Sequence, residues 1–183
     1  MTRVLAGRAR NLRSVMGRKR IDIVQEFIKI RDLPYWIPLT LAEPDECCTG
    51  KAKMLFEILK QGGYSVRYRV CKTRWSDLNF PPEIIAIPHG DESSHTYLEI
   101  CIDGNWKIVD ATWDSKLRKT FTINDWDGES DNVAAFPIRE ILSPEKSEDY
   151  IQHILTSDAI VADLKVNREF YRAVNEWLEK KRE

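Results

Sequence analysis

The dipeptide Asp103-Gly104 constrains the fold of this chain more than any other feature of its sequence. It separates two runs, 95–102 and 105–112, that we interpret as β-strands. An Asp-Gly pair between two strands is a strong indication of a two-residue hairpin turn, because both positions tolerate a positive φ. The sequence therefore predicts an antiparallel hairpin around which the remaining elements must be arranged.

The turn also fixes which residues pair across the hairpin. Ile102 is opposite Asn105, and the same register places Asp110 opposite Tyr97. Because side chains alternate along a strand, His95 and Asp110 then share one face as diagonal neighbours, about 7 Å apart at the backbone. A carboxylate at that distance can fix the tautomer of an imidazole and stabilise its charged form. A register slip of one residue would place the two groups on opposite faces.

Helical patterns flank the strands on both sides. In chain order we expect helices at 21–31 and 45–62, a strand at 66–70, a polar loop at 72–94, the hairpin, an irregular segment at 113–142 and helices from Ser143-Pro144-Glu145 onward. Asp45 is the expected N-cap of the second helix. Helices, then strands, then helices is the order typical of an α+β fold.

Length and composition indicate one globular domain over 1–183, with 143–183 as a C-terminal helical extension. No apolar run approaches the roughly 18 residues that a transmembrane helix requires. Four cysteines are too few for a disulfide scaffold in 183 residues. Free cysteines fit a reducing compartment, so we expect a cytoplasmic protein in which a cysteine is a buried apolar residue, a metal ligand or a nucleophile.

Cys48 is the cysteine with the most informative position. It falls in the first turn of the second helix, on the face that also carries Ala52, Leu55 and Leu59. Unpaired N–H groups and the helix dipole at such a position favour a thiolate, and the same N–H groups can bind a developing oxyanion. Cys47 points about 100° away on a helix. A plain buried cysteine is the alternative interpretation of Cys48.

Three motifs in the same order resemble those of the transglutaminase-like superfamily. Cys48-Thr49-Gly50-Lys51-Ala52, followed by the strand at 66–68, resembles the nucleophile helix and next strand of that family. His95-Thr96-Tyr97 resembles its histidine motif, and residues 106–112 resemble its tryptophan and aspartate strand. The resemblance covers roughly residues 21–113.

The resemblance implies a papain-like α+β core, with the cysteine helix packed on an antiparallel sheet. It also implies a Cys48-His95-Asp110 triad for acyl transfer from an amide, through a thioester acyl-enzyme resolved by water or by an amine. Tyr97 replaces the family's usual tryptophan and Ala111 its frequent proline, and neither change removes a catalytic group. The paired cysteine ligands of the family's zinc-binding branch are not evident, so we expect no metal and no cofactor.

Three aromatic residues are further candidates for oxyanion or substrate contacts. Trp36 offers an indole N–H from the loop before the cysteine, although core packing is the favoured role for it. Trp75 lies in the polar segment 72–94 with Phe80 and His89, and Tyr97 follows the histidine. We expect the substrate to be a peptide, a protein or a small amide. An inactive scaffold or binding module on the same fold is the competing hypothesis.

Residues 1–20 hold seven basic side chains and no acidic one, so this segment carries +7 and the rest of the chain −8. We interpret it as an amphipathic helix whose basic face is solvated. Contact with nucleic acid or an acidic surface is the alternative interpretation. The oligomeric state has no signature in the sequence.

Overall fold

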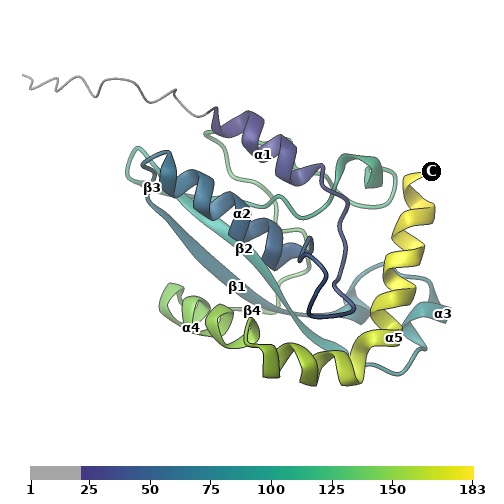
Figure 1. Cartoon of the computed structure of the whole chain (residues 1–183). Helices are drawn as coiled ribbons and strands as arrows, with labels where there is room; N and C mark the ends of the chain where they lie inside the picture. Colours follow the sequence, from purple (N-terminus) through teal and green to yellow (C-terminus); the bar gives the residue numbers. More distant parts are fainter. Residues whose placement is uncertain (1–21) are drawn as a thin grey trace, which may run out of the picture.

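The computed structural model describes residues 22–183, so the basic segment 1–20 lies outside the described residues. The helices are α1 (Ile23–Arg31), α2 (Cys48–Gln61), α3 (Pro82–Ile85), α4 (Pro144–Ile154) and α5 (Ser157–Arg182), and the strands are β1 (Val66–Arg74), β2 (Glu92–Ile102), β3 (Asn105–Val109) and β4 (Glu140–Ile141) (Figure 1). This composition confirms the α+β prediction.

The sheet has four antiparallel strands in the order β3-β2-β1-β4. The hairpin of β2 and β3 has the predicted register, with Ile102 opposite Asn105 and Leu98 opposite Val109. Asp103 and Gly104 adopt φ values of 47° and 80°, which is the positive-φ geometry that a tight hairpin turn requires. The predicted turn and pairing are therefore confirmed.

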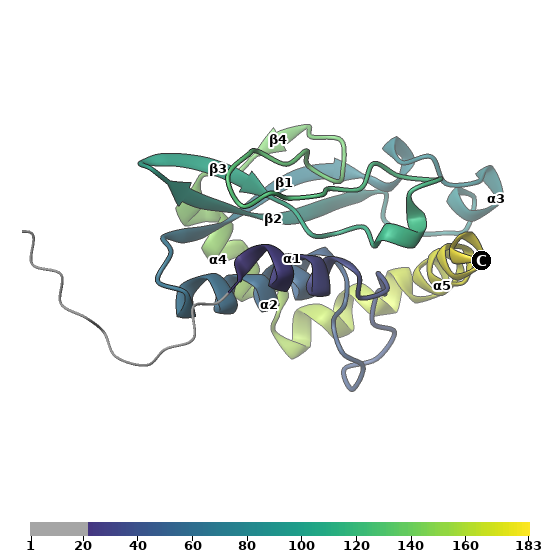
Figure 2. The same cartoon turned by 90° about the horizontal axis from the view of Figure 1, so that it is seen from above.

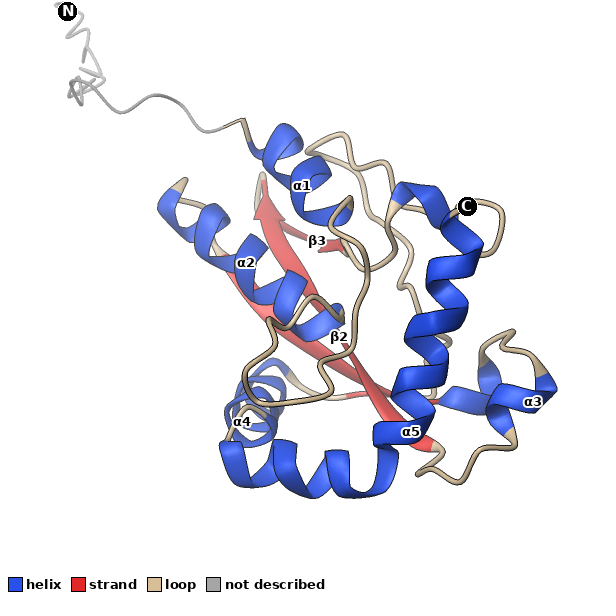
Figure 3. Ribbon diagram, turned by 45° about the vertical axis from the view of Figure 1, so that its right-hand side comes forward, coloured by secondary structure: helices blue, strands red, loops and turns tan. Residues whose placement is uncertain are grey.

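Helices α1 and α2 lie side by side, and α2 packs on β1 and β2 of the sheet (Figures 1 and 2). The predicted apolar face of α2 is confirmed, since Ala52, Leu55 and Leu59 are all buried in one cluster with the inner face of the sheet. A second cluster, rich in aromatic rings, lies where α5 crosses the other end of the sheet (Figure 3). Cys48, the first residue of α2, belongs to this second cluster.

The start of α2 differs from the prediction. The helix begins at Cys48 and its N-cap is Cys47, not Asp45. Asp45 instead accepts the Cys47 N–H on its Oδ1 at 3.0 Å, within the loop that leads into the helix. An aspartate that bonds to the backbone two residues on forms an Asx turn, and this local alternative to capping explains the shift.

The segment 72–94, which we expected to be a polar loop, is mostly ordered structure. β1 continues through Arg74, a 3₁₀ turn occupies Trp75–Asp77, and β2 already begins at Glu92. Trp75 and Phe80 are buried in the aromatic cluster. Most polar residues of this segment remain at least partly exposed, whereas Trp75 and Phe80 are buried and anchor these short elements.

The C-terminal helices begin as predicted. Ser143 caps α4 by accepting the Lys146 N–H, and α5 buries Phe170, Val174 and Leu178 on one face. The segment between β3 and β4 is largely irregular, as predicted, apart from one 3₁₀ turn at Ser115–Leu117. Within residues 22–183, no helix is both long enough and apolar enough to cross a membrane.

Candidate functional site

His95 and Asp110 form a buried hydrogen-bonded pair. His95 Nε2 lies 2.7 Å from Asp110 Oδ2, and the two side chains are 0% and 1% exposed. β2 carries His95, and Asp110 directly follows the last residue of β3. The hairpin register therefore brings together the two residues that the sequence placed on one face.

The Asp110 carboxylate is held in position by backbone donors as well. The Thr112 N–H donates to Oδ1 at 3.0 Å and the Ala135 N–H to Oδ2 at 2.8 Å. Burial opposes the charged carboxylate, but the neighbouring His95 charge and these hydrogen bonds lower the pKa of Asp110 below its ordinary value. Asp110 is thus a fixed negative charge directed at the imidazole.

Aromatic rings enclose the imidazole of His95. The Phe136 ring stacks on it with centroids 4.6 Å apart and an interplanar angle of 14°, and Tyr97 lies 6.0 Å away on a nearly parallel plane. Trp113 extends the stack beyond Phe136 at 5.3 Å. Sequence reasoning missed Phe136, because it falls in the irregular segment. Its one available signal was the apolar run 133–136 within polar surroundings.

Cys48 is the first residue of α2 and is 7% exposed. Its thiol lies 3.9 Å from the Thr49 hydroxyl, which itself lies 3.1 Å from the hydroxyl of Thr96 on β2. This contact joins the start of the helix to the strand next to His95. Cys48 thus reaches the histidine from a different element than the one that carries Asp110.

The thiol of Cys48 and the imidazole of His95 shift each other's pKa. A hydrogen bond from the Cys47 thiol, together with the His95 ring, holds the pKa of Cys48 well below its ordinary value against the effect of burial. Burial opposes the imidazolium, but the Asp110 carboxylate and the Cys48 sulfur raise the pKa of His95 to about 10. Near neutral pH both shifts favour a thiolate–imidazolium pair.

The two nitrogens of His95 have different environments. Nε2 is engaged by Asp110, whereas Nδ1 is buried and has no hydrogen-bond partner of normal geometry among the described residues. Since the Cys48 sulfur interacts with this ring, Nδ1 is the nitrogen available to it. The imidazole therefore keeps one ring nitrogen for a partner other than Asp110.

Cys47 also belongs to the site, contrary to the expectation that it points away from Cys48. That expectation assumed helical geometry, whereas Cys47 is the N-cap and has an extended backbone with φ −80° and ψ −171°. Its hydrogen bond to Cys48, burial and the nearby Asp45 carboxylate raise the pKa of the Cys47 thiol well above its ordinary value. These interactions favour the protonated form of the Cys47 thiol.

The first turn of α2 offers backbone donors beside the thiol. The Lys51 N–H is the first in the helix to find a backbone acceptor, the Cys47 carbonyl at 3.0 Å. Among residues 22–183, the N–H groups of Cys48 and Thr49 have no hydrogen-bond acceptor. Free N–H groups at a helix start are suited to bind a negative oxygen.

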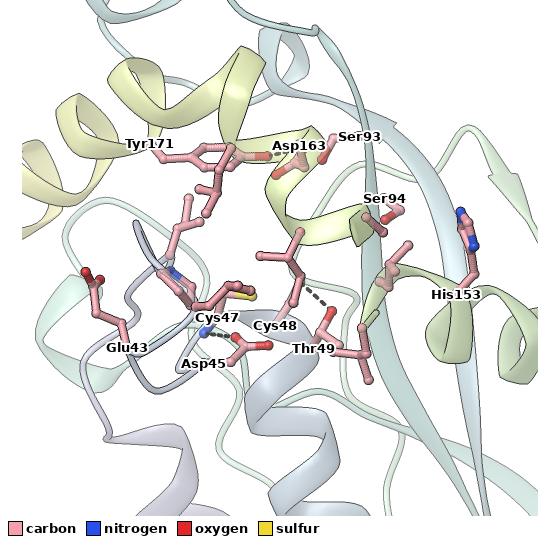
Figure 4. A pocket seen from close by; sticks show the side chains of 18 of the residues that line it. Glu43, Asp45, Cys47, Cys48, Thr49, Ser93, Ser94, His153, Asp163 and Tyr171 are labelled. Carbon is pink, nitrogen blue, oxygen red and sulfur yellow. Dashed lines mark hydrogen bonds between the residues drawn. The ribbon is translucent and has the colours of Figure 1, made fainter. Parts of the chain in front are cut away.

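A cavity of about 340 Å³ opens onto the two cysteines. Figure 4 shows Asp45, Cys47 and Cys48 on one wall and Tyr171 and Asp163 of α5 facing them. The volume suits a small ligand or a single side chain of a larger one. His95 is not among the lining residues, and its imidazole is fully buried.

Lys51 of α2 connects three segments near the site through hydrogen bonds of its side chain. Its side chain is 1% exposed, and Nζ donates to the backbone carbonyls of Arg31 at 2.9 Å, Leu33 at 2.6 Å and Thr112 at 2.9 Å. Burial lowers the pKa of Lys51 to about 8. The ammonium group therefore ties α2 to α1 and to the segment whose Thr112 N–H holds Asp110.

The other predicted aromatic residues have different positions. Trp36 is not among the cavity-lining residues, and its indole N–H donates to Glu43 Oε2 at 3.1 Å. Trp75 lines the cavity. Tyr97 is buried beside His95 and does not line the cavity. Phe80 and His89 do not line it either: Phe80 packs edge-on against Trp177, and His89 stacks on Phe170.

Within residues 22–183, no group of three or more His, Cys, Asp or Glu side chains is arranged to hold a metal ion. All four cysteines lie in this part of the chain and are free thiols. Protein-family models, curated proteins and solved structures provide no match to the chain.

Proposed function

We propose that this protein is a cysteine-dependent acyl-transfer enzyme of the transglutaminase-like type, with Cys48, His95 and Asp110 as its catalytic residues. The observation that carries the proposal is the buried hydrogen bond of 2.7 Å between His95 and Asp110, next to the Cys48 thiol at the start of α2. The opposite directions of the pKa shifts at Cys48 and His95 support it. The fold supports the same reading, because a helix that begins with the nucleophile packs on an antiparallel sheet, as in a papain-like core.

The proposed reaction has two halves. The Cys48 thiolate attacks an amide carbonyl carbon, and the carbonyl oxygen becomes an oxyanion that the Cys48 N–H can bind. The His95 imidazolium gives its Nδ1 proton to the leaving amine, so that a thioester remains on Cys48. Water or a second amine then attacks the thioester, returning its proton to His95 and releasing an acid or a new amide.

The remaining residues support these steps. Asp110 keeps the imidazole oriented and charged until the proton leaves. The rings of Phe136 and Tyr97 pack beside His95, whose side chain is fully buried, and the exclusion of water strengthens the electrostatic interactions within the pair. Since the nucleophile must stay a free thiol, we also propose that the protein works in a reducing compartment such as the cytoplasm.

Thiol alkylation tests the nucleophile. The protein is treated with iodoacetamide at about pH 6, and each cysteine is followed by mass spectrometry of its peptide. Cys48 should react first, because only the thiolate is alkylated. Burial raises the pKa of Cys71 to about 12, so this thiol is an internal control that should stay unmodified.

Acyl transfer itself is tested with an activated ester such as 4-nitrophenyl acetate. A burst of nitrophenolate and an acetyl adduct on Cys48 are expected, and both should be lost in Cys48→Ser and in His95→Ala. Cys101→Ser is the matched control, because Cys101 lies far along β2 from the site. Equal, slow labelling of all four thiols and no burst would overturn the proposal.

A further inference from the structure

The cavity beside Cys48 has acidic walls. Four carboxylates line it, from Glu43, Asp45, Glu92 and Asp163, and the lining includes no lysine or arginine. His153 at the rim is the only basic side chain among the lining residues. A molecule that enters the cavity therefore meets acidic groups from both sides.

These charges are largely uncompensated. Among residues 22–183, Glu43, Asp45 and Asp163 have no cationic partner within ion-pair distance, and only Glu92 approaches one, Arg74 at 3.9 Å. Unpaired charges that line a cavity focus the electrostatic potential within it.

Neutral donors hold two of the unpaired carboxylates in place. Glu43 accepts hydrogen bonds from the Leu39 N–H at 2.9 Å and from the Trp36 indole at 3.1 Å. Asp163 accepts from Asn167 at 2.7 Å and from the Tyr171 hydroxyl at 3.2 Å. Such bonds orient a carboxylate without neutralising its charge.

Aromatic side chains complete the walls. Tyr35, Trp75, Phe136 and Tyr171 line the same cavity as the carboxylates. Aromatic rings provide apolar surface on which the methylene stem of a cationic side chain can pack. Cys48 lines the same cavity. Nucleophile, carboxylates and aromatic side chains thus border a space the size of one long side chain.

We propose that the acyl substrate of this site is cationic, with an alkylammonium or guanidinium group such as a lysine or arginine side chain close to the carbonyl that reacts. The proposal rests on the proposed function for the identity of the reacting group. The cation occupies the space between Glu43 and Asp163, and its carbonyl is presented to Cys48. Substrates with an anionic group at that place are excluded by the same carboxylates.

The charge preference is measured on the thiol itself, without any acyl substrate. Three methanethiosulfonate reagents that differ in charge are compared on the full chain: the trimethylammonium-ethyl, the methyl and the sulfonatoethyl compounds. Rates at Cys48, followed by mass spectrometry, are divided by the rates for glutathione. We expect the normalised rate of the cationic reagent to exceed that of the anionic one about tenfold or more, and the ratio to fall when salt is added.

Two cavity variants and one matched control test whether the carboxylates of the cavity cause the charge preference at Cys48. Glu43→Gln and Asp163→Asn should each reduce the cation-to-anion ratio about threefold. Glu176→Gln removes an exposed carboxylate from the same helix as Asp163, outside the cavity, and should leave the ratio unchanged. A further comparison uses peptide amides that differ only in a lysine, norleucine or glutamate residue, for which cleavage or transfer should follow the same order.

The outcomes separate this proposal from the proposed function. Two results would overturn the cationic substrate. One is a cation-to-anion rate ratio at Cys48 equal to the ratio measured for glutathione, and the other is a ratio that neither cavity variant changes. If iodoacetamide still labels Cys48 selectively, the acyl-transfer proposal stays intact. Absence of reaction at Cys48 with every reagent would overturn both.

Discussion

Replacing Gly50 by alanine sets two effects of opposite sign against each other. Gly50 lies in the first turn of α2, and alanine is favoured over glycine within a helix by about 1 kcal/mol. A Cβ at this position, however, would lie 1.8 Å from the Asp45 carbonyl oxygen and 2.5 Å from its carbonyl carbon. Both atoms belong to the backbone, so no side-chain rotation relieves the contact.

The contact should outweigh the helix propensity. Overpacking of a close-packed site costs about 1–3 kcal/mol or more, and moving Asp45 also strains its hydrogen bond to the Cys47 N–H at 3.0 Å, worth about 1 kcal/mol. After subtracting the gain from alanine, we expect Gly50→Ala to lower the free energy of unfolding by about 1–3 kcal/mol. For a chain of this size that corresponds to a fall in Tm of about 2–12 °C.

Urea unfolding followed by tryptophan fluorescence measures this change. Gly90→Ala is the matched control, because its Cβ would meet nothing closer than Asn167 Oδ1 at 3.6 Å, and its stability should stay within about 0.5 kcal/mol of the wild type. Gly50→Ala should also slow the alkylation of Cys48, since Asp45 and Cys47 must shift. A Gly50→Ala protein that is as stable as the wild type, or more stable, would refute this account of the start of α2.

The remaining predictions concern the pair at the site and the contacts that hold it. Asp110→Asn removes the charge that most raises the pKa of His95, so we expect that pKa to fall in an NMR titration and the alkylation of Cys48 at pH 6 to slow about tenfold; an unchanged pKa would contradict the ion-pair assignment. Between about pH 6.5 and 9 the folded thiolate–imidazolium pair and the unfolded chain bind the same number of protons, because the lowered pKa of Cys48 offsets the raised pKa of His95. The free energy of unfolding should therefore decline only as pH rises from about 9 through about 10, and this decline should be absent in His95→Gln. Trp36→Phe should leave the burst of nitrophenolate within about twofold of the wild type, because the Trp36 indole N–H already donates to Glu43. Loss of the burst would show that this N–H contributes to the oxyanion site. Arg182→Met should lower the free energy of unfolding by about 3–5 kcal/mol in a urea titration, since it breaks a buried ion pair at 2.9 Å; a change below 1 kcal/mol would show that the last turn of α5 is not anchored there.

The hairpin was the most predictable part of the fold. Asp103-Gly104 accounts for the register of β2 and β3 through local backbone preference alone, and that register is sufficient to bring His95 and Asp110 within hydrogen-bond distance. The face of α2 that carries Cys48 followed from helical periodicity in the same way.

The features of the site that could not be predicted from the sequence depend on tertiary contacts or on backbone geometry at a helix boundary. Phe136 reaches His95 from a segment without regular structure, so no periodic pattern indicates it. Lys51 resembles an exposed helical lysine, and only the convergence of three carbonyls from distant parts of the chain explains its burial. The expectation that Cys47 points away from Cys48 was wrong, because Cys47 is the N-cap and has an extended rather than a helical backbone. Boundaries are the least regular points of a helix.

The stacked rings at His95 also have a spectroscopic consequence. The imidazole lies over the face of Phe136, with centroids 4.6 Å apart and planes within 14° of parallel. Ring currents in the phenyl group shift protons above its face to lower frequency, so the carbon-bound protons of His95 should resonate away from those of free histidine. These shifts depend steeply on the distance between the rings. A single imidazole signal therefore shows whether the chain around Phe136 keeps its place, in the resting protein and whenever the cavity is filled.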